Sequence, residues 1–292
     1  MKRIAILGCE NSHANHFIAA MQTREEFSDA TVVGVYSDDP AAAEKLNERF
    51  GVPVMKDYAE AVGKIDALIV TARHGNSHYK FAKPYLKSGI PMFIDKPITI
   101  DEDEAIEFMR AAKANGVKLS GGSSLKQDET IRQLKEEASK DEEGNKTVGG
   151  ICRAPVSLDN PHGGFFFYSQ HLVEMVGEIF GRYPLSVTAK QNDGQVHVLF
   201  HYADYDCVGL YCNKSAEYYA CRFAEEGASG GRIPGDISKQ WYYKEFKEFY
   251  NILSGNEEGV DYADFIAPVM VLNAIDRSLK SGKEEEVRKF QL

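Results

Sequence analysis

Long apolar runs are missing from this sequence. None of its 292 residues belongs to an uninterrupted apolar stretch near the roughly 20 residues that a membrane-spanning helix needs. The first apolar run, Ile4–Leu7, follows two basic residues but stops at Gly8. It is therefore too short for a secretion signal, and we interpret it as a first strand.

Cysteine is scarce as well. The five cysteines are odd in number, scattered along the chain, and contain no C-x-x-C pair. This pattern argues against a disulfide scaffold and fits a reducing compartment, so we expect a cytoplasmic protein whose cysteines are small core residues.

The sequence has no surplus of positive charge. Its 34 Lys and Arg face 44 Asp and Glu, which gives a formal net charge of −10. We therefore expect neither nucleic acid nor an anionic membrane as a partner, because both need a basic surface. With 43% hydrophobic and 27% charged residues, the composition is that of a globular protein long enough for one large domain or two ordinary ones.

Residues 1–120 alternate between short apolar runs and helical patterns. Runs without polar interruption are typical of strands that are buried on both faces, and helices between them indicate parallel βαβ units. The expected strands are Ile4–Leu7, Val32–Tyr36, Ala67–Val70, Met92–Ile94 and Val117–Leu119; the expected helices are Pro40–Phe50, a stretch from Ser77 to Gly89, and Asp101–Asn115. We predict an α/β domain with a Rossmann-type, doubly wound parallel sheet.

The sequence pattern no longer alternates between strands and helices beyond residue 120. A further helical pattern over Ser124–Ser139 leads into a charged break at 140–146. Short β-rich runs with tight turns then predict an open, mainly antiparallel sheet. These runs are Val187–Lys190, Val196–Tyr202, Cys207–Cys212 and Tyr218–Phe223, and they are followed by two helices, Lys239–Leu253 and Tyr262–Ser281. We expect a dinucleotide-binding domain over 1–120 and an α+β substrate and oligomerisation domain over 121–292, which Tyr242 and Tyr243 help to pack.

The turn after the first strand is where a dinucleotide-binding fold places its pyrophosphate. Of the usual G-x-G-x-x-G pattern only Gly8 is present, and Glu10 brings a negative charge to the loop. Asn11 and Ser12 can still begin a helix whose amides hold an anion. A strand, turn and helix without any cofactor fits this segment equally well.

The second strand ends near a candidate for ribose binding. Ser37 stands where an acid usually takes the adenosine ribose hydroxyls, and Asp38 follows directly. Because no Arg or Lys is adjacent to accept a 2′-phosphate, NAD is favoured over NADP. The alternative interpretation is a polar cap at the start of the next helix.

Several motifs further along resemble the glucose–fructose oxidoreductase, inositol dehydrogenase and MocA (Gfo/Idh/MocA) family of NAD(P)-dependent oxidoreductases. The family's Glu-Lys-Pro signature is Asp95-Lys96-Pro97 here, at a matching spacing from Thr71. Residues 163–174 are similar to the family's glycine-led helix, which ends in Asp-x-Gly-x-His-x-x-Asp. This resemblance covers nearly the whole chain, although the C-terminal domain is short for the group.

The resemblance implies roles for individual residues. Lys96 would reach the substrate hydroxyl and the nicotinamide ribose, and its bond to Pro97 would be cis. His171 would be the general base, and Tyr168 could supply a hydroxyl beside it. Asp95 would lie beside the nicotinamide, and Thr71 and His78 would line the cofactor cleft. Together with the loop and ribose candidates above, the residues expected at the cofactor are Gly8, Asn11, Ser12, Ser37, Asp38, Thr71, His74, His78, Asp95 and Lys96. A base that titrates near neutrality and a cation for the developing alkoxide are what alcohol oxidation requires.

Two departures from the family pattern leave a second function open. The acid four residues before the histidine is Phe167, and the glycine two residues before it is Ser169. We expect an oxidoreductase acting on a sugar, cyclitol or related polyol, assembled as a dimer or tetramer through the outer face of the open sheet. The alternative is a non-catalytic relative that senses a small ligand or nucleotide.

Four further histidines are weaker candidates. His13 and His16 have helical spacing beside the loop and predict an exposed helix face, with a substrate or phosphate contact as the alternative. His197 and His201 share one face of a strand. We expect two surface histidines there and no metal site.

Overall fold

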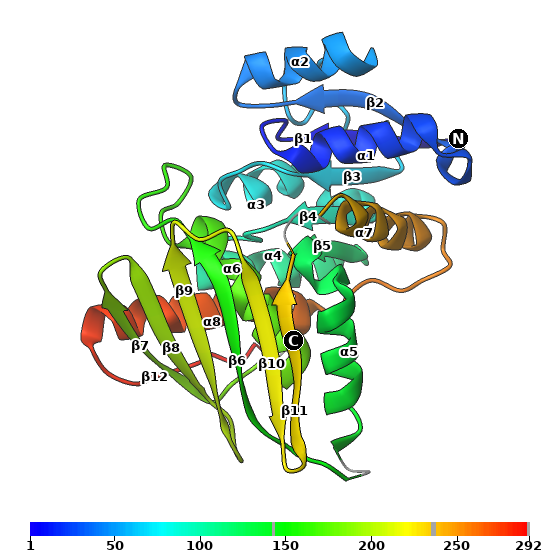
Figure 1. Ribbon diagram of the computed structural model, residues 1–292. Coiled ribbons are helices and arrows are strands. Elements are labelled where there is room, and N and C mark those ends of the chain that lie inside the picture. Colours follow the sequence, from blue (N-terminus) through cyan, green and yellow to red (C-terminus); the bar gives the residue numbers. More distant parts are fainter. Residues whose placement is uncertain (142–143, 235–237, 291–292) are drawn as a thin grey trace. The chain divides into compact units, whose positions relative to one another are not determined.

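The computed structural model describes residues 1–141, 144–234 and 238–290 (Figure 1). The chain divides into two compact units, and the first combines Met1–Gly122 with Lys239–Phe265. The second combines Ser123–Ser238 with Ile266–Leu292. Each unit is built around one β-sheet. Within the described ranges, no helix has the length and apolar character needed to span a bilayer.

The sheet of the first unit is wholly parallel, as predicted. Its strand order is β2-β1-β3-β4-β5, and every residue of β3 and β4 is buried because both faces of the sheet are covered. The strands are β1 (Lys2–Leu7), β2 (Ala30–Tyr36), β3 (Ala67–Val70), β4 (Met92–Asp95) and β5 (Leu119–Gly122). The carboxyl ends of β1, β3 and β4 therefore meet along one edge.

The helices of the first unit begin and end at the residues that favour such ends. Asp39 and Asp101 cap α2 and α4 with their side chains, and Gly51 ends α2 in the left-handed conformation. These helices are α1 (Ser12–Thr23), α2 (Pro40–Phe50), α3 (Asn76–Ala82) and α4 (Glu102–Ala114), with 3-10 turns η1 (Glu25–Phe27) and η2 (Lys83–Ser88). Helix α3 is shorter than expected because Pro84, which lacks an amide hydrogen, starts a 3-10 turn instead.

Helix α7 (Ser238–Leu253) returns to the first unit from far along the sequence. Its buried Phe246 packs against Phe17 and its buried Phe249 against Phe93, with ring centroids 5.2 Å and 5.9 Å apart. Full burial of each such ring contributes about 1.5–3 kcal/mol. Tyr242 and Tyr243 pack against this same cluster, so the expectation that they pack the second domain is wrong.

The second unit has the open, mainly antiparallel sheet that was predicted. Its strand order is β11-β10-β6-β9-β8-β7-β12, and only the β6–β9 pair is parallel. The strands are β6 (Thr147–Val156), β7 (Ser186–Asn192), β8 (Gln195–His201), β9 (Asp206–Asn213), β10 (Tyr218–Ala224), β11 (Gly227–Ile233) and β12 (Glu285–Glu286). The helical elements are η3 (Ser124–Gln127), α5 (Glu129–Ala138), α6 (Phe166–Phe180) and α8 (Tyr262–Ser281).

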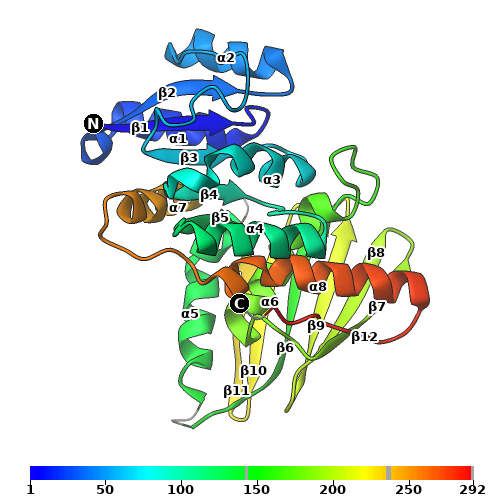
Figure 2. The same cartoon turned by 180° about the vertical axis from the view of Figure 1, so that it is seen from behind.

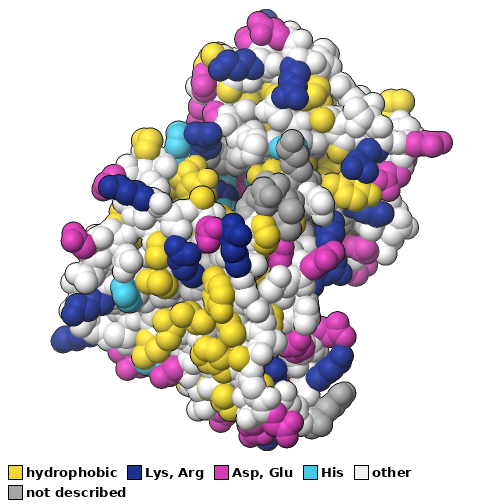
Figure 3. Space-filling model, in the orientation of Figure 1, with side chains coloured by type: hydrophobic (Ala, Val, Ile, Leu, Met, Phe, Trp, Pro, Cys, Tyr) yellow, Lys and Arg dark blue, Asp and Glu magenta, His cyan; other side chains and the backbone are white. Residues whose placement is uncertain are grey.

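The two faces of this second sheet differ. Helices α6 and α8 lie on one face (Figure 2), while the other carries a group of exposed apolar side chains (Figure 3). Val208 on β9 is 41% exposed, and Phe223 and Tyr219 on β10 are 42% and 37% exposed; the two strands flank β6. Contiguous apolar surface of this kind is uncommon on a protein that stays alone.

Candidate active site

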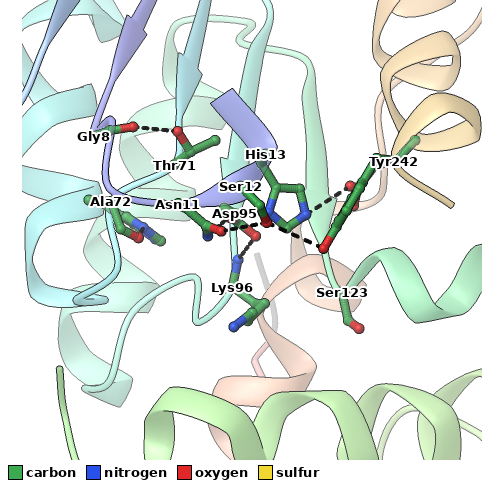
Figure 4. A network of polar contacts seen from close by, with 12 residues as sticks. Gly8, Asn11, Ser12, His13, Thr71, Ala72, Asp95, Lys96, Ser123 and Tyr242 are labelled. Atoms are coloured by element: carbon green, nitrogen blue, oxygen red, sulfur yellow. Dashed lines mark hydrogen bonds and ion pairs between the residues drawn. The ribbon is translucent and has the colours of Figure 1, made fainter. Parts of the chain in front are cut away.

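The loop after β1 is held tightly against the end of β3 (Figure 4). Gly8 has φ +86°, and a Cβ there would lie 2.2 Å from the backbone nitrogen of Ala72, so only glycine fits. The Thr71 hydroxyl donates to the Gly8 carbonyl at 2.5 Å. The one fingerprint glycine that the sequence keeps is therefore the one that this turn requires.

The start of α1 is left open to an anion. Asn11 is the N-cap residue, but its side chain makes no capping bond and instead donates from Nδ2 to Asp95 at 2.6 Å. The first turn carries no acidic residue, so its amides keep their partial positive charge. Ser12, beside it, donates to the Tyr242 hydroxyl at 3.4 Å. A pyrophosphate fits this arrangement.

Two acids lie near the end of β2, where ribose binding is expected: Asp38, and Glu10 from the loop after β1. The Ser37 hydroxyl donates to Glu10 at 2.5 Å, which directs one oxygen of the Glu10 carboxylate toward β2. Asp38 is half exposed and accepts from the Tyr36 hydroxyl at 2.9 Å. Its other oxygen lies 3.4 Å from Nζ of Lys80, a cation from α3 that the neighbouring sequence does not reveal.

Lys96 follows the end of β4 in a buried setting. Its backbone amide donates to Oδ1 of Asp95 at 2.7 Å, its peptide bond to Pro97 is cis as expected, and its residue is only 7% exposed. Burial lowers the pKa of the Lys96 ammonium, while the Asp95 carboxylate opposes that shift and Arg73 adds to it. The result is a lysine poised at the carboxyl edge of the sheet, where α/β folds bind ligands.

His13 lies between two buried carboxylates. Its Nδ1 is 3.1 Å from Oδ2 of Asp95 and its Nε2 is 3.4 Å from Oε2 of Glu245 on α7. Burial opposes the charged imidazolium, but these two carboxylates outweigh burial and raise the pKa of His13 to about 9. Although burial also opposes the Asp95 carboxylate, His13 beside it lowers the Asp95 pKa overall. The expected exposed helix face is thus wrong for His13, which is 3% exposed.

The two histidines that follow β3 contact backbone groups of the turn between β3 and α3. His78 is fully buried, its Nε2 lies 2.7 Å from the Ala72 carbonyl, and burial lowers its pKa. Nδ1 of His74 accepts from the amide of Asn76 at the start of α3. The structure thus ties both side chains to the β3–α3 turn, next to the Gly8 loop.

In the second unit, His171 lies on α6 with Ser123 against its ring. The Ser123 hydroxyl is 2.6 Å from Nδ1 of His171, and the rings of Tyr168 and Tyr218 lie 5.5 Å and 5.9 Å away. Glu174, one turn further along α6, accepts from the Ser123 amide at 2.5 Å. Burial raises the pKa of Glu174 to about 7.

Ser123 and Glu245 are functional candidates that the sequence reasoning missed. Glu245 had a usable signal, because Trp241, Glu245 and Phe249 are spaced by four and share one helix face, two members of which are aromatic. Ser123 had none, since it follows β5 in a short polar stretch.

Two further histidines, His197 and His201, form contacts within the second sheet. His201 pairs with Asp206 at 2.9 Å, and His197 contacts Gln195 at 3.2 Å. The part of the chain that the structure describes holds no group of three or more side chains suited to a metal ion.

Taken together, a parallel sheet, a glycine turn before an uncapped helix, and a buried acid–lysine pair at the sheet edge are typical of dinucleotide-binding domains. Residues 2–123 match the model of the Gfo/Idh/MocA oxidoreductase family, described as having an NAD-binding Rossmann fold. Over this part, which is less than half of the chain, the protein is similar to that family.

Curated relatives are similar to part of the chain. The chain is 29% identical to inositol 2-dehydrogenase of Burkholderia multivorans over 139 residues, which is 46% of this chain and 40% of that protein. It is 25% identical to inositol 2-dehydrogenase of Rhizobium meliloti over 56% of this chain and 51% of that protein. The matched part thus spans about half or less of these relatives.

The fold likeness extends over nearly the whole chain. The crystal structure of scyllo-inositol dehydrogenase from Lactobacillus casei with bound NAD(H) and scyllo-inositol superposes with a TM-score of 0.84. That match covers 98% of this chain and 99% of the other at 16% identity, so it concerns the fold alone.

Proposed function

We propose that this protein is an NAD-dependent dehydrogenase that oxidises a secondary hydroxyl of a sugar, cyclitol or related polyol. The observation that carries the proposal is the buried Asp95–Lys96 pair at the sheet edge, beside an α1 N-terminus whose side-chain cap is diverted to Asp95. The matched relatives named as inositol 2-dehydrogenases support a polyhydroxylated substrate.

Residues of the first unit would hold the cofactor. The α1 amides after Gly8 would take the pyrophosphate, Asp38 the adenosine ribose, and Thr71, His74 and His78 would maintain the adjoining turn. A carboxylate at Asp38 favours NAD because it repels a 2′-phosphate. When bound, the nicotinamide supplies the hydride acceptor.

The chain's own groups would manage the proton and the charge. The Lys96 ammonium would stabilise the oxygen of the substrate as negative charge develops on it. His171 would take the hydroxyl proton, and Tyr168 would add a hydroxyl near that base. In this proposal, residues 1–120 bind the dinucleotide and residues 121–292 serve substrate binding and assembly.

Titration with NADH tests the proposal. Binding should enhance nicotinamide fluorescence in a saturable way below millimolar cofactor, and NAD should then be reduced in the presence of inositols or sugars. No binding at millimolar NADH would refute the dehydrogenase. Binding without turnover on any polyol would instead favour the ligand-sensing alternative.

We further propose that the exposed face of the second sheet pairs with a second copy of this chain. Its apolar side chains lie on β9 and β10, which flank β6, and burying them would remove apolar surface from water. Sedimentation should show a dimer or tetramer for the native protein and monomers for Val208→Glu. Val62→Glu is the matched control, since Val62 is similarly exposed but lies in the first unit; equal masses for all three proteins would contradict the interface.

A further inference from the structure

The ring of His171 lies against a buried serine. Helix α6 buries His171 to 8% exposure, and the Oγ of Ser123, which is 0% exposed, lies 2.6 Å from Nδ1. This distance is at the short end for a hydrogen bond, so the two groups are held in a fixed geometry.

The helix itself offers no acceptor at the position one turn earlier. A residue four before His171 lies on the same helix face, and here it is Phe167. The Phe167 ring packs against the rings of His162 and Tyr168 at 5.6 Å and 5.0 Å. An aromatic ring cannot orient an imidazole by accepting its N–H as a carboxylate would.

Ser123 is fixed by its neighbours. Its backbone amide donates to Oε2 of Glu174, and its Oγ accepts from the amide of Leu125 at 3.2 Å. Glu174 in turn accepts from Gln170 at 3.3 Å and faces the positive charge of Lys126. A hydroxyl oxygen has two acceptor sites, and the Leu125 amide uses one of them. The other is available for the N–H of His171.

We propose that Ser123 is a positioning residue that accepts the Nδ1–H of His171 and thereby keeps the proton off Nε2 in the neutral ring. The inference deepens the proposed function, on which the role of His171 as a base rests. In the reaction, the O–H bond of the substrate breaks and an Nε2–H bond forms. The Nδ1–H bond of His171 remains intact and donates to the Ser123 oxygen throughout. The ring therefore need not turn or exchange tautomers.

The tautomer can be observed without any cofactor. Long-range proton–nitrogen NMR of histidine-labelled protein distinguishes Nδ1–H from Nε2–H, and His171→Gln identifies the signals of His171. We expect Nδ1–H for the neutral ring in the native protein and a mixture of tautomers in Ser123→Ala. Nε2–H in the native protein, or unchanged His171 signals in Ser123→Ala, would overturn the proposal.

A neighbouring serine provides the matched control. Ser124 is also buried, at 5% exposure, so Ser124→Ala loses the same atom one residue away and should leave the tautomer unchanged. Ser123→Thr keeps a hydroxyl and should restore the native signals. Equal changes in both alanine variants would show a general packing effect and overturn the assignment.

Turnover separates this inference from the proposed function. If the native protein reduces NAD, Ser123→Ala should lower kcat by roughly tenfold, a part of the 10²–10⁴-fold that a positioned base contributes. Ser124→Ala should not lower it. A native protein that shows Nδ1–H but no NAD-dependent oxidation would refute the dehydrogenase and leave the positioning by Ser123 intact.

Discussion

Lys96→Ala is expected to lower kcat by on the order of 10²–10³-fold while the dissociation constant for NADH changes only a few-fold. Removing one charged donor that faces a developing oxyanion typically has an effect of this size. The Gly8 turn and the α1 N-terminus, which would hold the dinucleotide, do not depend on the lysine ammonium. Stopped-flow kinetics and fluorescence titration measure the two quantities on the same preparation.

The fold should survive this substitution. Asp95 keeps its hydrogen bond from Asn11 and its ion pair with His13, so its buried charge remains compensated. Lys83→Ala is the control, since Lys83 is exposed and pairs with Glu107 on the surface. Equal losses of turnover and NADH affinity in Lys96→Ala would make Lys96 a cofactor clamp only and contradict its proposed role in the chemical step.

Much of the fold was predictable because short-range sequence signals in the first 120 residues mark its helices and strands. The predicted Pro40–Phe50 helix matches α2 residue for residue, since a proline at its start and a glycine after its end mark both boundaries. The Ala67–Val70 strand is likewise correct, because an unbroken apolar run suits a strand that is buried on both faces.

The strands that escaped prediction lack this signature. Strand β11 (Gly227–Ile233) contains three glycines and one large apolar residue, and β6 (Thr147–Val156) is interrupted by Gly149, Gly150 and Pro155. Both exist because partners in the sheet satisfy their backbone groups, as β10 does for each of them. Such pairing is a tertiary effect that local propensity does not contain.

Only those site residues that belong to a recognisable sequence motif were predictable. The Asp95-Lys96-Pro97 stretch and its cis bond follow from the family resemblance. The partner of His13 does not, because Glu245 lies 232 positions away and reaches the first unit only through α7. A buried ion pair across such a separation depends on how the chain folds back, which the spacing of residues within one helix cannot indicate.

That buried pair has a measurable consequence for stability. In the folded protein the pKa of His13 is about 9, above its ordinary value of 6.5, so protonation of His13 stabilises the fold fully below about pH 6.5. The stabilisation is lost as the pH rises through 9. A shift of this size corresponds to about 3 kcal/mol, at roughly 1.4 kcal/mol per pH unit.

Trp241, the single tryptophan, reports on this transition, because it lies buried on α7 within the first unit. In urea denaturation followed by its fluorescence, His13 should contribute about 3 kcal/mol less to the free energy of unfolding at pH 10 than at pH 6.5. Glu174 shifts in a lower range, from its ordinary value up to about pH 7. Burial raises the pKa values of Cys9, Cys152 and Cys207, which also lowers the stability above about pH 8.5, so the His13 contribution is the difference between the native profile and that of a His13 variant.

Replacing His13 should remove this pH dependence at a large cost. His13→Gln leaves Asp95 and Glu245 buried without their shared cation, and breaking such a cluster typically destabilises by about 3–5 kcal/mol. If that variant does not fold, the double variant His13→Gln, Glu245→Gln removes one of the two charges and should fold without the His13 part of the slope above pH 7. His16 lies one turn along α1 and stacks on Tyr242, so His16→Gln should keep the native slope. A native profile with the same slope as the double variant from pH 7 to 10 would show that the folded protein holds no extra proton at His13 and its two carboxylates.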